Sequence, residues 1–379
     1  MYNNKNHWLA ILILAAFLFS LFTISVSSFD TPNVSAKSAA LYEPITKTFV
    51  YTKNEHARLP MASTTKIMTA LVALENSELT DTVTVDSRSV GIEGSSAYLK
   101  EGDRYTIEDM LYALLLQSAN DAAVAIACEV GGDTESFVEM MNERVLSLGL
   151  ENTHFDNPNG LDGDTHYTTA HDLALITAEA MKNDSFRRIT STYKKTVTNG
   201  DSSRLFVNHN KLLKMYDGCT GVKTGFTKKS GRCLVGSAER DGLSLITVTL
   251  DAPNDWQDHK KMLDYGFGIY ENRVFAEAGE YSYDLPVINS KGKTVRVANT
   301  AALSAVMKRT EAEAQAHIKL PKYIIAPVNE GDILGSVIFT VDGEMIGKLD
   351  LVALDEVKTE GKKNIIIRIW DRLFNKDNS

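Results

Sequence analysis

The sequence contains few cysteines and no recognisable metal-binding motif. Its three cysteines, Cys128, Cys219 and Cys233, have no CxxC spacing, and an odd number of thiols cannot pair completely within one chain. The fold must therefore be held by a hydrophobic core and not by a disulfide framework. The eight histidines include no HExxH motif and no other pair at helical i, i+4 spacing. We expect neither a metal site nor a cofactor.

The sequence also lacks an excess of positive charge. Its 40 Lys and Arg stand against 49 Asp and Glu, which gives a formal net charge of −9. Such a chain would repel a polyanion over most of its surface, so we expect no nucleic-acid partner. The 44% of hydrophobic and 23% of charged residues are typical of globular proteins, and 379 residues suffice for two or three domains of about 150 residues.

The N-terminus carries an almost unbroken apolar run from Trp8 to Val26, preceded by Lys5. A basic start, an apolar centre and small residues at the cleavage point are typical of a secretory signal peptide, and Val34-Ser35-Ala36 supplies the small residues. We expect residues 1–36 to be a signal peptide, and the rest to be exported to the outer face of the cytoplasmic membrane or the cell wall. At about 19 residues the run is also long enough for an uncleaved transmembrane anchor. A buried core helix is a third interpretation.

The C-terminal residues 358–379 have a basic, amphipathic pattern. Six Lys and Arg stand against three acidic residues here, so the tail is net positive on an acidic protein. Apolar residues recur at helical spacing: Ile366, Ile369, Trp370, Leu373 and Phe374. A helix of this kind lies in the interface of anionic membranes, so we expect it to attach the protein to a membrane surface. Packing against the protein's own body is the alternative, which Ile367 on the polar face favours.

Residues 37–272 mix strand and helix signals. Short β-rich runs at 38–42 and 48–52 predict a hairpin, and further strands are expected at 222–226, 233–238 and 243–250. Apolar periodicity predicts helices at 61–75, 106–116, 121–130, 135–148 and 170–181, the second opened by a capping box from Thr106 to Asp109. A helical cluster bracketed by antiparallel strands indicates an α+β domain and not a doubly wound parallel sheet.

Residues 273–357 have almost no helical signal. Strand patterns at 283–288 and 294–298 flank a polar turn, and those at 337–341 and 345–352 flank Asp342-Gly343. We expect a small all-β domain in which no residues suggest catalysis.

The strongest chemical signal is Ser63-Thr64-Thr65-Lys66, at the start of the first long helix. Residues i and i+3 share a helix face, so the Ser63 hydroxyl and the Lys66 amine can meet. A serine is a poor nucleophile until a base takes its proton, and a lysine can do so when burial or a nearby cation lowers its pKa. Two further Ser-x-x-Lys matches, at 191–194 and 290–293, lie in a strand-like stretch and in a turn, and show how weak this pattern is alone.

Two other elements distinguish the first match from the others. Ser118-Ala119-Asn120 lies in a break between two apolar helices, where a polar loop can point into a cleft. Lys223-Thr224-Gly225 opens an amphipathic strand, whose glycine lets a ligand approach the strand edge closely.

Together these three elements resemble the signatures of penicillin-binding proteins and serine β-lactamases. The sequence around these motifs is similar to that of one branch, the low-molecular-mass D-alanyl-D-alanine carboxypeptidases. The segments that carry the resemblance are 59–70 (LPMASTTKIMTA), 117–123 (QSANDAA), 157–161 (NPNGL) and 221–227 (GVKTGFT). That family also has a β-rich second domain and a C-terminal amphipathic membrane anchor, which agrees with the separate interpretation of the tail.

The resemblance implies a role for each motif residue. Ser63 would attack the carbonyl between two D-alanines and form an acyl-enzyme, with Lys66 as the base. Ser118 would relay the proton to the leaving D-alanine, and Asn120 would hold the peptide amide. The implied partners are the peptidoglycan stem pentapeptide that ends in D-Ala-D-Ala and the β-lactam antibiotics, which would acylate Ser63.

The strand motif is implied to bind the substrate's charged end. Lys223 and Thr224, beside Gly225, would receive the terminal carboxylate. The oxyanion hole would consist of the backbone N–H groups of Ser63 and of a residue after Gly225, which we expect by position to be Thr227.

The sequence departs from the family pattern in two places. Phe226 stands where some relatives have a histidine. Some relatives also carry an arginine for the carboxylate, but the matching stretches 208–211 and 255–258 read Asn-His-Asn-Lys and Asp-Trp-Gln-Asp, so no such arginine is identified.

Three alternative functions stay open. A β-lactamase needs a water-activating carboxylate, commonly a Glu four residues before an Asn on a loop. Glu179 and Asn183 have that spacing but end a helical run, which speaks against it. A non-catalytic cell-wall scaffold that binds penicillin and a transpeptidase that uses an amine acceptor are the other two.

Overall fold

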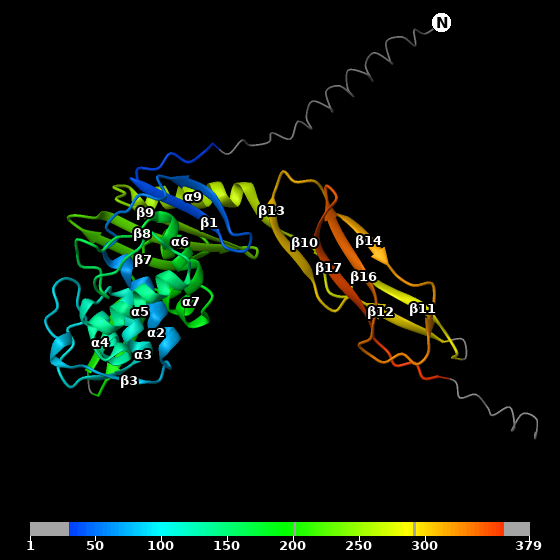
Figure 1. Cartoon of the computed structure of the whole chain (residues 1–379), viewed down its shortest axis with the longest axis horizontal. Coiled ribbons are helices and arrows are strands. Elements are labelled where there is room, and N and C mark those ends of the chain that lie inside the picture. Colours follow the sequence, from blue (N-terminus) through cyan, green and yellow to red (C-terminus); the bar gives the residue numbers. More distant parts are fainter. Residues whose placement is uncertain (1–29, 201, 291–292, 360–379) are drawn as a thin grey trace, which may run out of the picture.

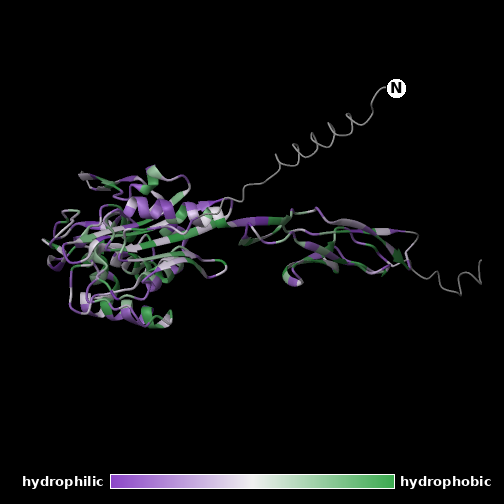
Figure 2. Cartoon of the chain, turned by 90° about the horizontal axis from the view of Figure 1, so that it is seen from above, coloured by the Kyte–Doolittle hydropathy of each residue, from purple (hydrophilic) through white to green (hydrophobic). Residues whose placement is uncertain are grey.

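The computed structural model describes residues 30–359 apart from 201 and 291–292 (Figure 1). The apolar run at 8–26 and the predicted tail helix lie outside these residues. The described residues form two domains, which lie end to end when seen from above (Figure 2). None of their helices is long and apolar enough to cross a membrane.

A five-stranded antiparallel sheet forms the centre of the first domain. Its strands, in spatial order, are β2 (Thr48–Lys53), β1 (Ser38–Glu43), β9 (Leu243–Leu250), β8 (Gly231–Arg240) and β7 (Cys219–Thr227). The predicted hairpin is confirmed as β1 and β2, and the three later strands are confirmed as β7 to β9. One edge of the sheet is β7, the strand that carries Lys223-Thr224-Gly225.

Both faces of this sheet are covered, and this explains why its central strands are so apolar. In β1 every residue is buried: Ala40 and Tyr42 face the main helical cluster, whereas Ala39 and Leu41 belong to the core on the opposite face. Figure 1 shows α9 on one side of the sheet and the main helical cluster on the other side. The predicted α+β architecture is confirmed.

Eight α-helices are described, of which the first five were predicted from the sequence. They are α2 (Lys66–Asn76), α3 (Ile107–Leu116), α4 (Asn120–Gly131), α5 (Thr134–Ser147), α6 (Ala170–Ala180), α7 (Asp184–Ser191), α8 (Leu212–Met215) and α9 (Asp255–Ile269). A 3-10 turn, η1 (Ala62–Thr65), precedes α2, and η2 (Ser87–Ser89) follows β3. The predicted capping box is present, since the Thr106 hydroxyl accepts the N–H of Asp109 at 3.1 Å and the Asp109 carboxylate accepts the N–H of Thr106 at 3.4 Å.

Helix α9 was not predicted, because its buried face is partly polar. Asp255, Asp258 and His259 are buried together with Met262 and Leu263, so apolar periodicity is weak along this segment. Two antiparallel strand pairs complete the domain: β3 (Thr82–Thr84) with β4 (Arg104–Thr106), and β5 (Lys194–Asn199) with β6 (Ser202–Val207).

The folded domain starts before the boundary predicted at residue 36. Val34 is 3% exposed and Ala36 is fully buried. Between them, the Ser35 hydroxyl donates to the Asp258 carboxylate at 2.6 Å. The segment that would end the signal peptide is thus packed against α9.

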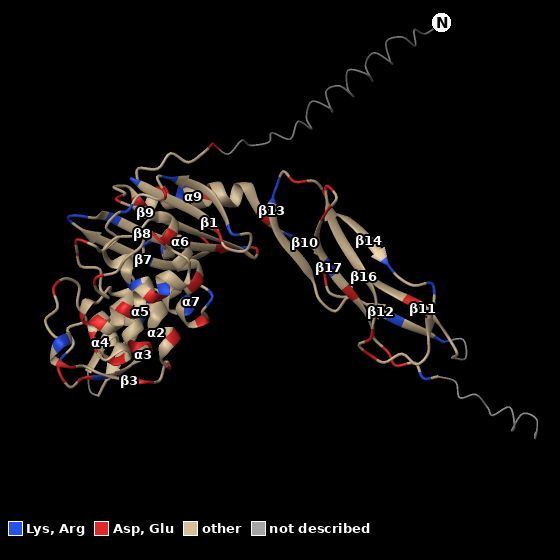
Figure 3. Ribbon diagram, in the orientation of Figure 1, with Lys and Arg blue, Asp and Glu red and all other residues tan. Residues whose placement is uncertain are grey.

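The second domain is all-β, as expected. Its six-stranded sheet consists of β14 (Gln315–Lys319), β16 (Ile333–Val341), β17 (Glu344–Ala353), β12 (Thr294–Ala298), β11 (Ser282–Ile288) and β15 (Ile324–Ile325). A separate pair, β10 (Tyr270–Ala276) and β13 (Leu303–Lys308), follows directly from α9. The predicted boundary at 272 therefore falls inside β10. Lys and Arg are interspersed with Asp and Glu along the described ribbon of both domains (Figure 3).

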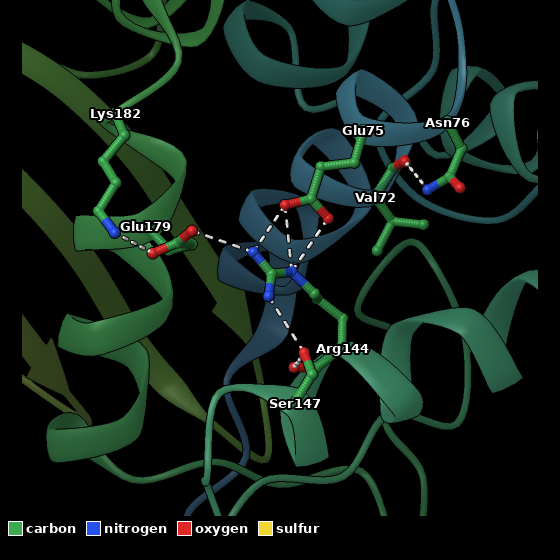
Figure 4. Close-up of polar contacts among 7 residues, drawn as sticks. All are labelled: Val72, Glu75, Asn76, Arg144, Ser147, Glu179 and Lys182. Carbon is green, nitrogen blue, oxygen red and sulfur yellow. Dashed lines mark hydrogen bonds and ion pairs between the residues drawn. The ribbon is translucent and has the colours of Figure 1, made fainter.

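An ion network joins helices α2, α5 and α6 (Figure 4). Arg144 of α5 contacts Glu75 of α2 at 2.7 Å and Glu179 of α6 at 3.0 Å. Glu179 also pairs with Lys182 at 2.6 Å. Glu179 therefore lies in helix packing and not on a loop beside Ser63, so it does not fit the water-activating carboxylate of a β-lactamase.

Replacing Arg144 by Met should destabilise the first domain by about 1–2 kcal/mol, because two partly buried carboxylates would lose their shared cation. Arg187→Met is the matched control: it breaks the Arg187–Asp184 pair, whose side chains are 51% and 88% exposed, and should cost less than about 0.5 kcal/mol. Urea unfolding followed by tryptophan fluorescence measures both. Equal losses would mean that the network contributes no more than a surface pair.

Candidate active site

The turn η1 brings Ser63 and Lys66 together at the start of α2. The Lys66 amine (Nζ) lies 3.1 Å from the Ser63 hydroxyl (Oγ), so the predicted i, i+3 contact is made. Ala62, just before the serine, has a φ of 47°, a conformation that costs about 1–2 kcal/mol in a residue with a side chain. The residue that precedes Ser63 is therefore one of the strained positions of the backbone.

Lys66 is fully buried and donates to three acceptors. Besides Ser63, these are the Asn120 side-chain oxygen at 2.7 Å and the backbone carbonyl of Asn159. Burial lowers the pKa of Lys66 well below its usual range; the positive charge of Lys223 lowers it further, and Asp121 opposes the shift. A lysine of this kind loses its proton readily and can then accept the proton of Ser63.

The break between α3 and α4 presents Ser118 and Asn120. Ser118 has a φ of 61° and lines the same cavity as Ser63. The Asn120 carboxamide is oriented at both ends, since its oxygen accepts from Lys66 and its NH2 group donates to the Glu93 carbonyl at 2.5 Å. Asn120 thus holds the Lys66 amine in place, a contact that the sequence did not indicate.

Asp121, next to Asn120, fixes the loop at 96–99 by hydrogen bonds. It is 1% exposed and accepts the Ser96 hydroxyl at 2.6 Å and the backbone N–H groups of Ala97 and Leu99 at 2.9 and 3.1 Å. The sequence analysis did not identify Asp121, because its partners lie more than 20 residues away in the chain.

The strand β7 contributes the second buried lysine. Lys223 is 1% exposed, and its amine donates to the Thr224 carbonyl at 2.9 Å. Burial lowers the pKa of Lys223 to about 7. Lys223 is therefore charged in part of the molecules at neutral pH, where its charge favours the neutral form of Lys66.

Gly225 lies against the turn that carries Ser63. A Cβ atom here would lie 3.0 Å from the Met61 carbonyl and 3.1 Å from the backbone nitrogen of Ser63. The glycine thus lets the edge strand approach the nucleophile turn itself, and not only a ligand.

The segment 157–161 forms the wall behind Lys66. Gly160 has a φ of 88°, and a Cβ atom there would lie 2.1 Å from the Ala62 carbonyl. The preceding carbonyls accept hydrogen bonds from the nucleophile helix: Asn159 from Lys66, and Pro158 from the Thr69 hydroxyl at 2.5 Å. The sequence resemblance included this segment but assigned it no role.

His166 contacts the turn η1 through the hydroxyl of Thr65. Its Nδ1 accepts the N–H of Asp156 at 2.9 Å, so Nε2 carries the proton and donates to the Thr65 hydroxyl at 2.7 Å. Burial lowers the pKa of His166 to about 4, which keeps the ring neutral. These contacts give His166 a structural role.

Thr227 does not fit the oxyanion role expected for it. Its N–H donates to the Ser230 hydroxyl at 3.0 Å, within the turn to β8. Successive N–H groups of a strand point to opposite sides, so the N–H that points to the open edge belongs to Phe226. The residue expected from the sequence therefore lies one position too far along the strand for its N–H to point to the open edge.

These groups surround a cavity of about 370 Å³ at the edge of the sheet, lined on one side by Ser63 and Ser118 and on the other by Thr224 and Arg232. Within the described ranges, no three His, Cys, Asp or Glu side chains are grouped as metal ligands. Cys233 also lines the cavity, but burial raises the pKa of its thiol to about 11, so it is protonated and unreactive at neutral pH.

Two known protein families match the sequence of this chain. The D-alanyl-D-alanine carboxypeptidase family of S11 peptidases matches residues 25–254, and the C-terminal domain of penicillin-binding protein 5 matches residues 270–359. The chain belongs to the D-alanyl-D-alanine carboxypeptidase family.

Individual relatives of this carboxypeptidase cover both domains or the first alone. The D-alanyl-D-alanine carboxypeptidase DacF of Bacillus subtilis is 34% identical, over 86% of this chain and 87% of its own. The structure of penicillin-binding protein 5 from Haemophilus influenzae has a TM-score of 0.63 and 28% identity, over 86% of this chain and 98% of its own. A mutant of the Streptomyces K15 DD-transpeptidase has a TM-score of 0.61 and 35% identity, over 63% of this chain and all of its own.

Gly160→Ala should slow the reaction of Ser63 in this carboxypeptidase by at least about tenfold, because the new methyl group must displace the nucleophile turn. Gly102→Ala is the matched control, since Gly102 has a similar φ of 83° with no atom within 4 Å of the new methyl group. It should lose about 1 kcal/mol of stability and retain the rate. Labelling with fluorescent penicillin measures the rate; equal slowing in both variants would contradict the steric explanation.

Lys223→Gln should move the acid limb of the pH–rate profile of acylation to higher pH. Removing the Lys223 charge removes a repulsion that lowers the pKa of Lys66, so the pKa of Lys66 rises and its neutral form requires a higher pH. The midpoint is read from penicillin acylation rates between pH 4 and 10, separately from any loss of binding. An unchanged midpoint would show that the two amines do not interact.

Proposed function

We propose that Ser63 is the nucleophile of this serine D-Ala-D-Ala carboxypeptidase, which removes the terminal D-alanine from peptidoglycan pentapeptides. The observation that carries the proposal is the buried Lys66 amine, 3.1 Å from the Ser63 hydroxyl and with a strongly lowered pKa.

Acylation begins when neutral Lys66 takes the proton of Ser63. The Ser63 oxygen then bonds to the carbonyl carbon of the penultimate D-alanine, and the carbonyl becomes an oxyanion. As the C–N bond breaks, the leaving amine receives a proton through the hydroxyl of Ser118, which faces the same cavity. Free D-alanine departs and the shortened peptide remains as an ester of Ser63.

Deacylation repeats these steps with water. The amine of Lys66, again neutral, takes a proton from the attacking water, whose oxygen bonds to the ester carbon. The Ser63 oxygen leaves with a proton, and the tetrapeptide acid is released. No cofactor enters either half of the reaction.

The oxyanion is stabilised by two backbone N–H groups. Ser63 supplies one, and Phe226, which lines the cavity, supplies the other in place of Thr227. The close approach of Gly225 to the backbone nitrogen of Ser63 places the edge of β7 beside the reacting carbonyl.

The substrate's terminal carboxylate lies toward Lys223 and Thr224. A carboxylate there is attracted by the Lys223 ammonium and can accept a hydrogen bond from the Thr224 hydroxyl. Because the pKa of Lys223 is about 7, this attraction weakens above neutral pH.

Penicillins carry a strained amide and a carboxylate in a similar relation, so they acylate Ser63 in the same way. A transpeptidase differs only in that an amine replaces water in the second half, and the relative named as a DD-transpeptidase supports a minor activity of this kind. A β-lactamase activity finds no support, because Glu179 is held by Arg144 and Lys182.

The location of the protein follows from its ends. The predicted signal peptide would export the chain, and the basic tail at 358–379, for which the sequence predicts an amphipathic helix, would bind the outer face of the cytoplasmic membrane. The active site would then face the cell wall.

The test is incubation of the full chain with a pentapeptide ending in D-Ala-D-Ala. We expect release of one D-alanine per peptide, a loss of about 1,000-fold or more in Ser63→Ala, and full activity in Ser191→Ala, which alters another Ser-x-x-Lys match. Penicillin should add its mass to the wild type and to Ser191→Ala but not to Ser63→Ala.

The alternatives predict other results. Rapid penicillin hydrolysis without lasting acylation would mean a β-lactamase, and acylation without D-alanine release would mean a scaffold. Either outcome would contradict the proposed reaction.

A further inference from the structure

One wall of the active-site cavity is basic, and the proposed mechanism does not use it. Arg232 of β8 lines this wall, on the strand next to β7. In the register of the two strands it lies directly opposite Phe226, the residue after Lys223-Thr224-Gly225. Side chains opposite each other project to the same side of a sheet, so Arg232 extends beside the strand edge where the substrate binds.

Arg232 is held in place by two residues of α9. Its Nη2 lies 2.8 Å from the carboxylate of Asp255, whose side chain is 3% exposed. The guanidinium also lies over the ring of Trp256, 5.7 Å from its centre. Asp255 in turn accepts the backbone N–H of Trp256 at 2.9 Å, so its carboxylate is itself fixed. The guanidinium is therefore preorganised before any ligand arrives.

This arrangement leaves most donors of the guanidinium available. An arginine has five N–H donors, and within the described residues Arg232 has one hydrogen bond, through Nη2 to Asp255. Its side chain is 43% exposed, toward the cavity. A planar guanidinium with free N–H groups matches a carboxylate, which it binds through two parallel hydrogen bonds.

The surrounding charges favour an anion. Lys211 lines the same cavity, and Lys223 lies at its β7 side, whereas Asp255 is the one carboxylate among the lining residues. His209, also in the lining, has a pKa lowered by burial and by Lys223, so its ring is neutral at neutral pH and adds no charge to this wall. Asp255 is neutralised by its pair with Arg232, which leaves the wall net positive.

We propose that Arg232 binds the C-terminal carboxylate of the substrate and thereby restricts the enzyme to peptides that end at the leaving D-alanine. The proposal rests on the proposed carboxypeptidase function. It supplies, from the neighbouring strand, the arginine that the stretches 208–211 and 255–258 lack. A peptide that continues beyond the D-alanine, or whose carboxylate is masked, presents no anion here and leaves Arg232 without this partner.

The experiment compares ligands with and without a carboxylate in three variants of the full chain. Arg232→Gln removes the cation, Arg232→Lys keeps the charge without the planar fork, and Lys228→Gln removes an exposed positive charge from the β7–β8 hairpin outside the cavity. The ligands are the D-Ala-D-Ala pentapeptide, penicillin, and the methyl ester of the same penicillin. The readouts are kcat/KM for D-alanine release and the second-order rate constant of Ser63 acylation by mass.

Arg232→Gln should lose about 10–100-fold in kcat/KM for the peptide and in acylation by penicillin, while acylation by the methyl ester changes less than about twofold. Arg232→Lys should lie between the wild type and Arg232→Gln, because it keeps the charge alone. Lys228→Gln should behave as the wild type.

Two results would overturn the proposal: retention of the peptide and penicillin rates in Arg232→Gln, or an equal loss for the ester, which indicates a structural role. Failure of the proposed function gives a different result, since the wild type would then neither release D-alanine nor be acylated.

Discussion

The structure of the catalytic domain depends on keeping a fully buried lysine amine beside a serine hydroxyl. Removing an ammonium from water costs several kcal/mol, so an isolated buried Lys66 would be strongly destabilising. The fold answers with an acceptor for each of its N–H bonds, from Ser63, Asn120 and Asn159, and with a second buried cation, Lys223, that favours the neutral form. The environment that destabilises the charged amine also favours its neutral form, and a neutral amine can accept a proton.

Much of the surrounding architecture serves this one amine. Gly225 brings the edge strand against the nucleophile turn, and Gly160 brings the segment that accepts from Lys66 against the same turn. His166 holds the turn from behind through Thr65. The sheet gives these parts a rigid support because both its faces are covered, by the main helical cluster and by α9. Helix α9 has a second effect, since the residues at its start also fix Arg232 at the far wall of the cavity.

The sequence predicted most of the fold, because long apolar periods and turn signals are local. The hairpin at the start, the helices from α2 to α6 and the strands β7 to β9 all follow such patterns. Helix α9 was missed because its buried face carries Asp255, Asp258 and His259, whose burial depends on partners far away in the chain. The oxyanion assignment to Thr227 was wrong for a related reason. The direction of an N–H group depends on strand pairing, and the turn to Ser230 decided it.

The sequence by itself determined the class of chemistry. Three short motifs, each with the residue types that an activated serine and a carboxylate ligand require, indicated the proposed nucleophile, its proposed base and the strand proposed to bind the substrate. Only the tertiary structure decided how far the lysine pKa values fall, which carbonyl completes the shell of Lys66, and that Arg232 lines the cavity. The physical reason is that burial and electrostatic coupling arise between segments that are distant in sequence, so no local pattern records them.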